Sequence, residues 1–93
     1  MYLACRKDDL GGSDLKDCKL TSANLQGAIL TSTEFRNADL RNADLRDANL
    51  TNADLRNADL REAILYSSNT TPEKLKNIKL PAKWHEQVFI IDG

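Results

Sequence analysis

The stretch 37–60 reads NADLRNADLRDANLTNADLRNADL, which places a leucine at every fifth position. An α-helix turns by about 100° per residue, so leucines five residues apart would spiral around its surface instead of forming an apolar stripe. In one continuous strand the side chains alternate, and an odd spacing would put successive leucines on opposite faces. The period therefore predicts short extended pieces separated by bends, so that the chain coils and turns every leucine toward one axis.

The same phase continues on both sides of this stretch. A large apolar residue, which we call the pentad centre, recurs from 10 to 65, and a small residue lies two positions before nearly every centre. Alternate residues of an extended piece point the same way, so we expect both inside, with the mostly polar flanking residues outside. The centres are Leu10, Leu15, Leu20, Leu25, Leu30, Phe35, Leu40, Leu45, Leu50, Leu55, Leu60 and Leu65; the preceding positions are Asp8, which is the exception, and Ser13, Cys18, Ala23, Ala28, Thr33, Ala38, Ala43, Ala48, Ala53, Ala58 and Ala63.

This A-[DN]-L-x-x motif resembles the pentapeptide-repeat family over residues 8–67, about two thirds of the chain. The resemblance implies an all-β fold, a right-handed quadrilateral parallel β-helix with four pentads per coil and therefore about three coils. We expect one β-helix over 1–67 and a C-terminal cap over 68–93. Many members of this family have no assigned biochemical role, so the resemblance predicts fold better than function.

The repeat ends after Tyr66. Thr71 followed by proline is typical of a helix N-terminus, and we expect a short helix near 72–79 that Pro81 ends. An apolar tail, WHEQVFIID, follows at 84–92. Two interpretations of this tail stay open: it caps the last coil, or it docks to another chain.

The first residues already follow the phase, with Leu3 at a small position and Cys5 at a centre, so we expect no separate element to cap the first coil. An exposed coil end is a template for another strand, which predicts either a homodimer through coil ends or C-terminal tail, or truncation from a longer parent chain. We expect Cys5 and Cys18 to be buried free thiols rather than disulfide or metal partners.

Outward positions predict the surface. With four pentads per coil, Asp14, Glu34 and Asp54 form one column beside a basic column that starts at Lys16, and similar pairs occur on two further faces. The remaining face is nearly uncharged, and removing it from water costs least. We therefore select the following candidate protein-binding residues: Ile29, Thr31, Asn49 and Thr51 on this face, and Trp84, Phe89 and Ile91 in the tail.

Composition disfavours several functions. A DNA mimic that binds DNA gyrase, as quinolone-resistance members of the family do, needs a long acidic rod. The repeat region, however, has eleven acidic and seven basic residues, and the whole chain has a net charge of -1. Interleaved arginines without stacking aromatics disfavour nucleic-acid binding. A core of leucine and alanine leaves no catalytic pocket, and His85 has no nucleophile motif around it.

These observations predict a non-enzymatic protein-protein interaction or scaffold module whose protein partner is unidentified, with the DNA-mimic regulator of gyrase as the alternative. We expect no catalytic residue, no cofactor and no metal site. Because no apolar stretch is long enough to span a membrane and no signal-peptide layout is present, we expect a soluble, bacterial-type protein of the cytoplasm.

Overall fold

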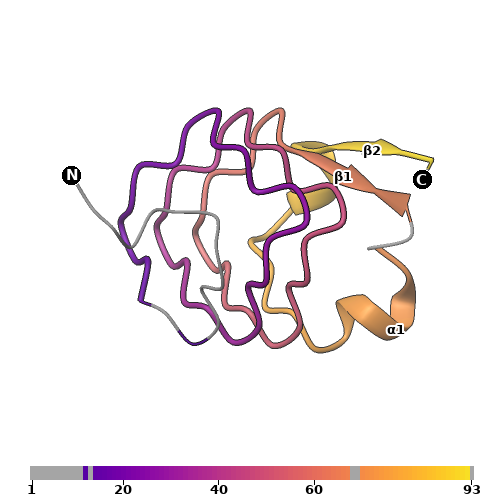
Figure 1. The fold of residues 1–93 in the computed structure, drawn as a ribbon, viewed down its shortest axis with the longest axis horizontal. Coiled ribbons are helices and arrows are strands. Elements are labelled where there is room, and N and C mark those ends of the chain that lie inside the picture. The colour runs from indigo at the N-terminus through magenta and orange to yellow at the C-terminus, as the bar shows by residue number, and fades with distance from the viewer. Residues whose placement is uncertain (1–11, 13, 68–69, 93) are drawn as a thin grey trace.

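The computed structural model describes residues 12, 14–67 and 70–92, and its chain winds repeatedly around one axis (Figure 1). Before the first strand, single bridge residues alternate with turns, which is the arrangement that a five-residue period with a bend predicts. Regular elements gather at the C-terminal end. They are β1 (Ile64–Tyr66), α1 (Pro72–Leu75), the 3-10 helix η3 (Trp84–Glu86) and β2 (Phe89–Ile91).

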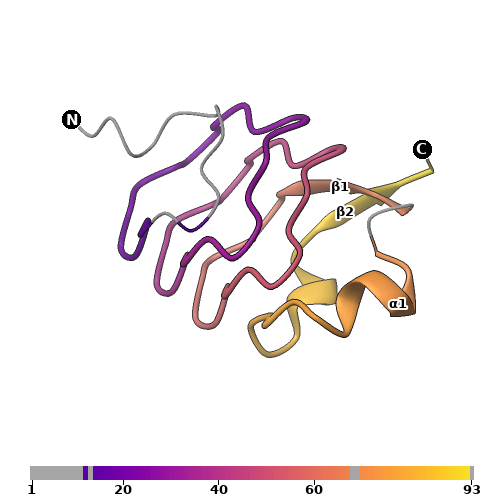
Figure 2. The ribbon, with the colours of Figure 1, turned by 60° about the horizontal axis from the view of Figure 1, so that its bottom comes forward.

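Bridge residues pair in parallel with residues twenty positions further along the chain, which is four pentads later. The Leu45 amide donates to the Ile64 carbonyl at 2.8 Å, and the Ile64 amide donates back to the Ala43 carbonyl at 2.9 Å. Successive coils thus lie side by side and are joined by main-chain hydrogen bonds, forming a β-helix (Figure 2). The bridge columns are Asp14, Glu34 and Asp54; Lys19, Asp39 and Asp59; Asn24, Asp44 and Ile64; and Ile29 with Asn49.

The bends depend on the second residue after each centre, which adopts the left-handed backbone conformation. At the non-glycine positions φ lies between 58° and 64° in the repeat. This conformation is energetically unfavourable for most residues with a Cβ, whereas Asn, Asp and Gly adopt it most readily. This requirement explains why the position holds mainly short polar residues or glycine. The residues are Gly12, Asp17, Ser22, Gly27, Ser32, Asn37, Asn42, Asp47, Asn52, Asn57 and Glu62.

The interior consists of the predicted side chains. Every pentad centre from Leu15 to Leu65 is buried, and none is more than 8% exposed. The alanines from Ala28 onward at the small positions are buried as well, together with Thr33. Alternation of large and small side chains fills a narrow tube at the density of a protein interior. The predicted core is therefore confirmed at these positions. Cys18 and Ala23 are only partly buried and pack against the core, while Asp8, Leu10 and Ser13 lie outside the described residues.

The tail adds a partial layer over the last coil. Lys79 forms a parallel bridge with Asp54, and Phe89 pairs with Ile64 in the two-stranded β1-β2 sheet. In each of these two pairs the paired residues are twenty-five positions apart in the sequence, instead of twenty as in the coils. The chain has therefore taken one extra pentad, within an excursion that includes α1, before it resumes the pairing pattern of the coils.

Gln87 completes this layer with both its main chain and its side chain. Its main-chain carbonyl accepts a hydrogen bond from the Glu62 amide at 2.7 Å, and its side-chain Oε1 accepts one from the Leu60 amide at 3.1 Å. On the neighbouring side, the Lys79 carbonyl accepts the Leu55 amide at 2.6 Å. Backbone donors at the end of the last coil are thus satisfied by the tail, as buried amides require.

The helix differs from its prediction. Thr71 is the N-cap and Pro72 is the first helical residue, as expected, but the Thr71 side chain makes no capping bond and the helix ends at Leu75 rather than near residue 79. The reason is the bridge at Lys79, which requires extended backbone where the prediction had placed helix.

Cys18 is disulfide-bonded, so the prediction of a free thiol at this position is wrong. A local pattern showed only that Cys18 points toward the core, and it carried no information about a bond to another part of the chain. The predictions for residues 1–7, including Leu3 and Cys5, fall outside the described residues. Within residues 12, 14–67 and 70–92, no helix has the length and apolar character needed to cross a membrane.

Candidate protein-binding surfaces

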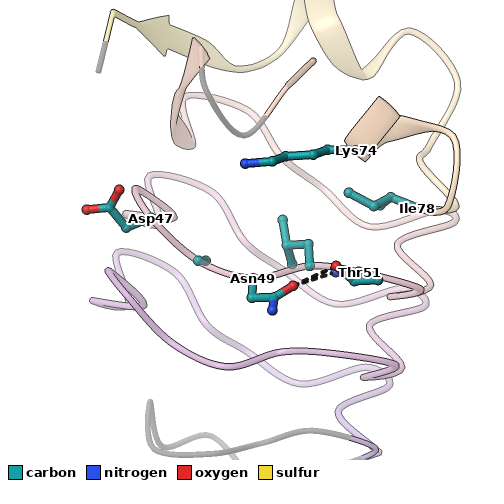
Figure 3. Close-up of a pocket in the computed structure, with 7 residues that line it drawn as sticks. Asp47, Asn49, Thr51, Lys74 and Ile78 are labelled. Carbon is teal, nitrogen blue, oxygen red and sulfur yellow. Dashed lines mark hydrogen bonds between the residues drawn. The ribbon is translucent and has the colours of Figure 1, made fainter. Parts of the chain in front are cut away.

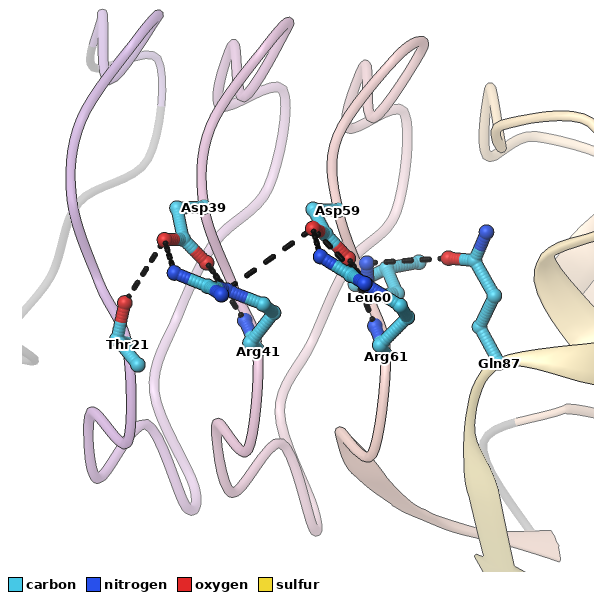
Figure 4. Close-up of polar contacts among 7 residues, drawn as sticks. All are labelled: Thr21, Asp39, Arg41, Asp59, Leu60, Arg61 and Gln87. Atoms are coloured by element: carbon cyan, nitrogen blue, oxygen red, sulfur yellow. Dashed lines mark hydrogen bonds and ion pairs between the residues drawn. The ribbon is translucent and has the colours of Figure 1, made fainter.

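Acidic and basic side chains form paired ladders on the outside of the coils. Arg41 donates to Asp39 through Nε at 2.9 Å and Nη2 at 2.7 Å, and Arg61 makes the same bidentate contact with Asp59 (Figure 4). The Thr21 hydroxyl donates to Asp39 at 2.9 Å. Each pair arises because the aspartate and arginine flank one pentad centre and therefore point to the same outer side.

Contacts also run between neighbouring coils. Arg41 Nε lies 3.9 Å from Asp59 Oδ2, and Arg36 Nε lies 3.7 Å from Asp54 Oδ2. Positive and negative groups thus alternate along the axis, which relieves repulsion within each column. The expected charge ladders are present among the described residues. The remaining pairs within one coil are Lys16 with Asp14, Arg36 with Glu34, Arg46 with Asp44, and Arg56 with Asp54.

Hydrogen bonds from arginine lower the pKa of four of the ladder carboxylates. Hydrogen bonds from Arg56 lower the pKa of Asp54 to about 2, and those from Arg41 hold the pKa of Asp39 well below its ordinary value. The pKa values of Asp44 and Asp59 are lowered by the same kind of contact. A general acid needs a pKa near the working pH, so these carboxylates are suited to holding charge rather than to transferring protons.

A groove lies between the last coil and α1 and has a volume of about 320 Å³ (Figure 3). Asn49 Oδ1 accepts from the Thr51 amide at 3.1 Å and from the Thr51 hydroxyl at 2.7 Å, so this acceptor is already satisfied. In the part of the chain that the structure describes, no group of three or more His, Cys, Asp and Glu side chains is placed to hold a metal ion. The lining residues are Asp47, Ala48, Asn49, Leu50, Thr51, Lys74 and Ile78.

Four of the sequence-predicted binding residues lie together on the outer face beside this groove. We call Ile29, Thr31, Asn49 and Thr51 the neutral column. Ile29 and Asn49 form a parallel bridge, which places them in adjacent coils. Ile29 is 49% exposed, Asn49 and Thr51 are exposed, and Thr31 is half-buried. The column therefore offers one apolar side chain in a mainly hydroxyl and amide surface.

A larger apolar surface lies at the C-terminal end of the coil. The β1-β2 pairing brings Ile64 beside Phe89 and Tyr66 beside Ile91, and we call these four residues with Ile90 the C-terminal patch. The side chains of Phe89, Ile90 and Ile91 are 57%, 45% and 43% exposed.

Sequence reasoning selected only Phe89 and Ile91 from this patch. It missed Ile64 and Tyr66, although their place at outward positions, where other pentads carry a charged pair, was a usable signal. The Arg46 guanidinium lies 5.9 Å from the centre of the Tyr66 ring and borders the patch.

Trp84 lies apart from these exposed residues in its packing. Its side chain is partly buried and contacts the hydrophobic core, as do Ile78, Leu80 and Val88. The His85 ring meets the Trp84 ring edge to face at 5.7 Å between centroids. Trp84 therefore anchors the tail to the coil, and less of its surface is available to a partner than that of Phe89.

Comparison with protein-family models identifies the repeat. A family model for pentapeptide repeats matches residues 9–47 and 43–69, with eight copies of the repeat. A search of curated proteins gives no match.

The solved structures similar to this chain include two pentapeptide repeat proteins. One is alr5209, a pentapeptide repeat protein from Nostoc PCC 7120, with 27% identity, a TM-score of 0.45, and coverage of 92% of this chain and 74% of that one. The other is AT2G44920, a pentapeptide repeat protein from the Arabidopsis thaliana thylakoid lumen, with 22% identity and a TM-score of 0.32. The match to it covers 95% of this chain and 61% of that one.

Proposed function

Because this chain belongs to the pentapeptide-repeat family, we propose that it is a non-enzymatic protein-binding or scaffold module built on a rigid β-helix. The proposal includes the finer geometry expected of the family, a right-handed, four-sided helix of about three coils with a short C-terminal helical cap. One observation carries it: Phe89, Ile90 and Ile91 are three consecutive large apolar residues, and each is more than 40% exposed on a framework held by main-chain hydrogen bonds.

Burial of this patch against another protein is energetically favourable. Apolar surface gains about 25 cal/mol for each Å² removed from water. Exposed apolar clusters of this kind often mark protein interaction sites. The neutral column is a second contact surface in the proposal, because its amides and hydroxyls lose less on desolvation than the ladder charges would.

The alternative, a DNA-mimic regulator of DNA gyrase, is less well supported. A mimic of the phosphate backbone needs unpaired negative charge along its length. Asp39, Asp44, Asp54 and Asp59 each hold an arginine within 2.7 Å. Their negative charge is therefore neutralised locally.

The cytoplasmic location stays a prediction. Stable disulfides are rare in a reducing cytoplasm, so the bonded Cys18 opposes this prediction. Cell fractionation with an antibody against the native protein tests it.

The test of the proposed function is affinity capture from extract of the native cells. The wild-type chain is compared with the double variant Phe89→Asp, Ile91→Asp and with Ile29→Asp, each checked for native circular dichroism. We expect specific partners that are lost with one of the variants and kept with Thr21→Ala, which alters a charged ladder instead. Identical capture by all folded variants would contradict binding through either surface.

A further inference from the structure

We infer that the C-terminal patch pairs with the same patch of a second copy of this chain, through antiparallel pairing of β2 with β2 about a two-fold axis. This inference rests on the proposed protein-binding function and names its partner. Three features of the described residues carry it: the free backbone edge of β2, the side chains on that strand, and the charges around it.

The backbone edge of β2 is self-complementary. The Phe89 amide donates to the Ala63 carbonyl at 2.7 Å, so the polar groups of Phe89 face β1. In a parallel strand the amide and carbonyl of one residue point to the same side and those of the next residue point to the opposite side. The amide and carbonyl of Ile90 therefore face the other edge, where the described residues provide no further strand. Two copies related by a two-fold axis at Ile90 exchange two hydrogen bonds there.

The side chains of β2 favour coverage of this edge. Solvent-exposed edge strands are usually protected by a charge, a proline or a bulge. β2 has the sequence FII, and all three residues are exposed. Pairing of two such strands places Phe89 of each copy opposite Ile91 of the other and brings apolar side chains together on both faces of the new sheet.

The charges around β2 permit the approach of a second copy and disfavour a strongly charged partner. A shallow depression beside Phe89 is bordered by the basic residues Arg61 and Lys83 and by the acidic residues Glu62 and Glu86. Because the two signs are equal in number, this border selects neither a basic nor an acidic surface. The net charge of -1 also produces little repulsion between two copies.

The predicted dimer is weak and depends on concentration. Stable interfaces bury about 1,200–2,000 Å² in total, and one short strand pair with its flanking side chains falls below this range. We therefore expect a dissociation constant above about 1 µM.

Analytical ultracentrifugation over a concentration series from about 5 µM to 1 mM tests the inference. The decisive variant is Ile90→Pro, which removes the amide on the free edge and leaves the bond from Phe89 to Ala63. Proline is tolerated on an edge strand when its nitrogen faces solvent. We expect the dissociation constant to rise at least about tenfold, because two hydrogen bonds and apolar contacts are lost. The control, Gln26→Asp, places a carboxylate at an exposed position outside both candidate surfaces and should dimerise like the wild type.

If Ile90→Pro does not fold, as judged by circular dichroism, the double variant Phe89→Asp, Ile91→Asp replaces it with the same expected result. A wild-type chain that stays monomeric up to 1 mM would overturn the inference. Dimerisation that a folded variant of the patch leaves unchanged would overturn it as well. A monomeric chain that still captures another protein in a patch-dependent way would exclude self-pairing and leave the proposed function intact.

Discussion

Substitution of Asn57 tests the origin of the five-residue period. Asn57 has φ of 64°, is exposed, and makes no side-chain hydrogen bond among the described residues, so its main contribution is its backbone conformation. Alanine in the left-handed region destabilises the folded state by about 1–2 kcal/mol, and glycine has no such penalty. Glycine in turn lowers the stability by about 0.4–1 kcal/mol, because it gives the unfolded chain more conformational freedom. The balance predicts that Asn57→Gly is more stable than Asn57→Ala by about 1 kcal/mol.

Thermal unfolding followed by circular dichroism measures this difference. For a domain of this size 1 kcal/mol corresponds to about 4–8 °C in Tm. Thr51 is the matched control, because it is an exposed residue of the neighbouring pentad and its φ is not positive. There we expect the reverse order, with Thr51→Ala more stable than Thr51→Gly. If alanine is as stable as glycine at position 57, the bends do not depend on the left-handed residues and the reasoning is refuted.

Three further results are expected. The pKa of Asp54 is about 2 in the folded protein and roughly 3.9 in an unfolded chain, so the ionised side chain stabilises the fold fully above about pH 4, and this contribution is lost as the pH falls through the folded pKa. Asp54→Asn should therefore reduce the loss of Tm between pH 5 and pH 2. An unchanged pH profile would contradict this role of Asp54. Gln87→Met leaves the Leu60 amide without its acceptor and should lower the free energy of unfolding in urea by about 1–3 kcal/mol. The control Gln26→Met on the open surface should have little effect. Equal effects of the two substitutions would contradict the role of the Gln87 side chain as an acceptor for the last coil. In a DNA gyrase supercoiling assay we expect no inhibition at micromolar protein, and inhibition would restore the DNA-mimic alternative.

The repeat could be predicted from the sequence because each pentad contains the residues that determine its own conformation and orientation. The spacing of Leu40, Leu45 and Leu50 requires one shared interior, and the small residue before each centre fixes the phase. The same register places Asp39 and Arg41 on the outside of one coil, so their ion pair could also be predicted. Local periodicity was sufficient wherever the structure repeats.

The tail could not be predicted to the same depth, because its contacts depend on residues far apart in the chain. The role of Gln87, whose side chain substitutes for a strand carbonyl, has no local signal. The early end of α1 follows from the bridge between Lys79 and Asp54, which is a long-range pairing. The left-handed positions, by contrast, had a visible signal: Asn, Asp, Ser or Gly recurs two residues after the centres.

The most direct test of the coil is to place a charge inside it and compare it with a charge outside. Leu45 is 1% exposed, and Leu45→Arg buries a guanidinium without a partner, which should cost more than about 4 kcal/mol. Thr51→Arg places the same side chain on the exposed neutral column and should change the free energy of unfolding by less than about 0.5 kcal/mol. Circular dichroism melting should show no cooperative transition for Leu45→Arg and a nearly native one for Thr51→Arg. Native melting of both variants would contradict an interior built from the pentad centres.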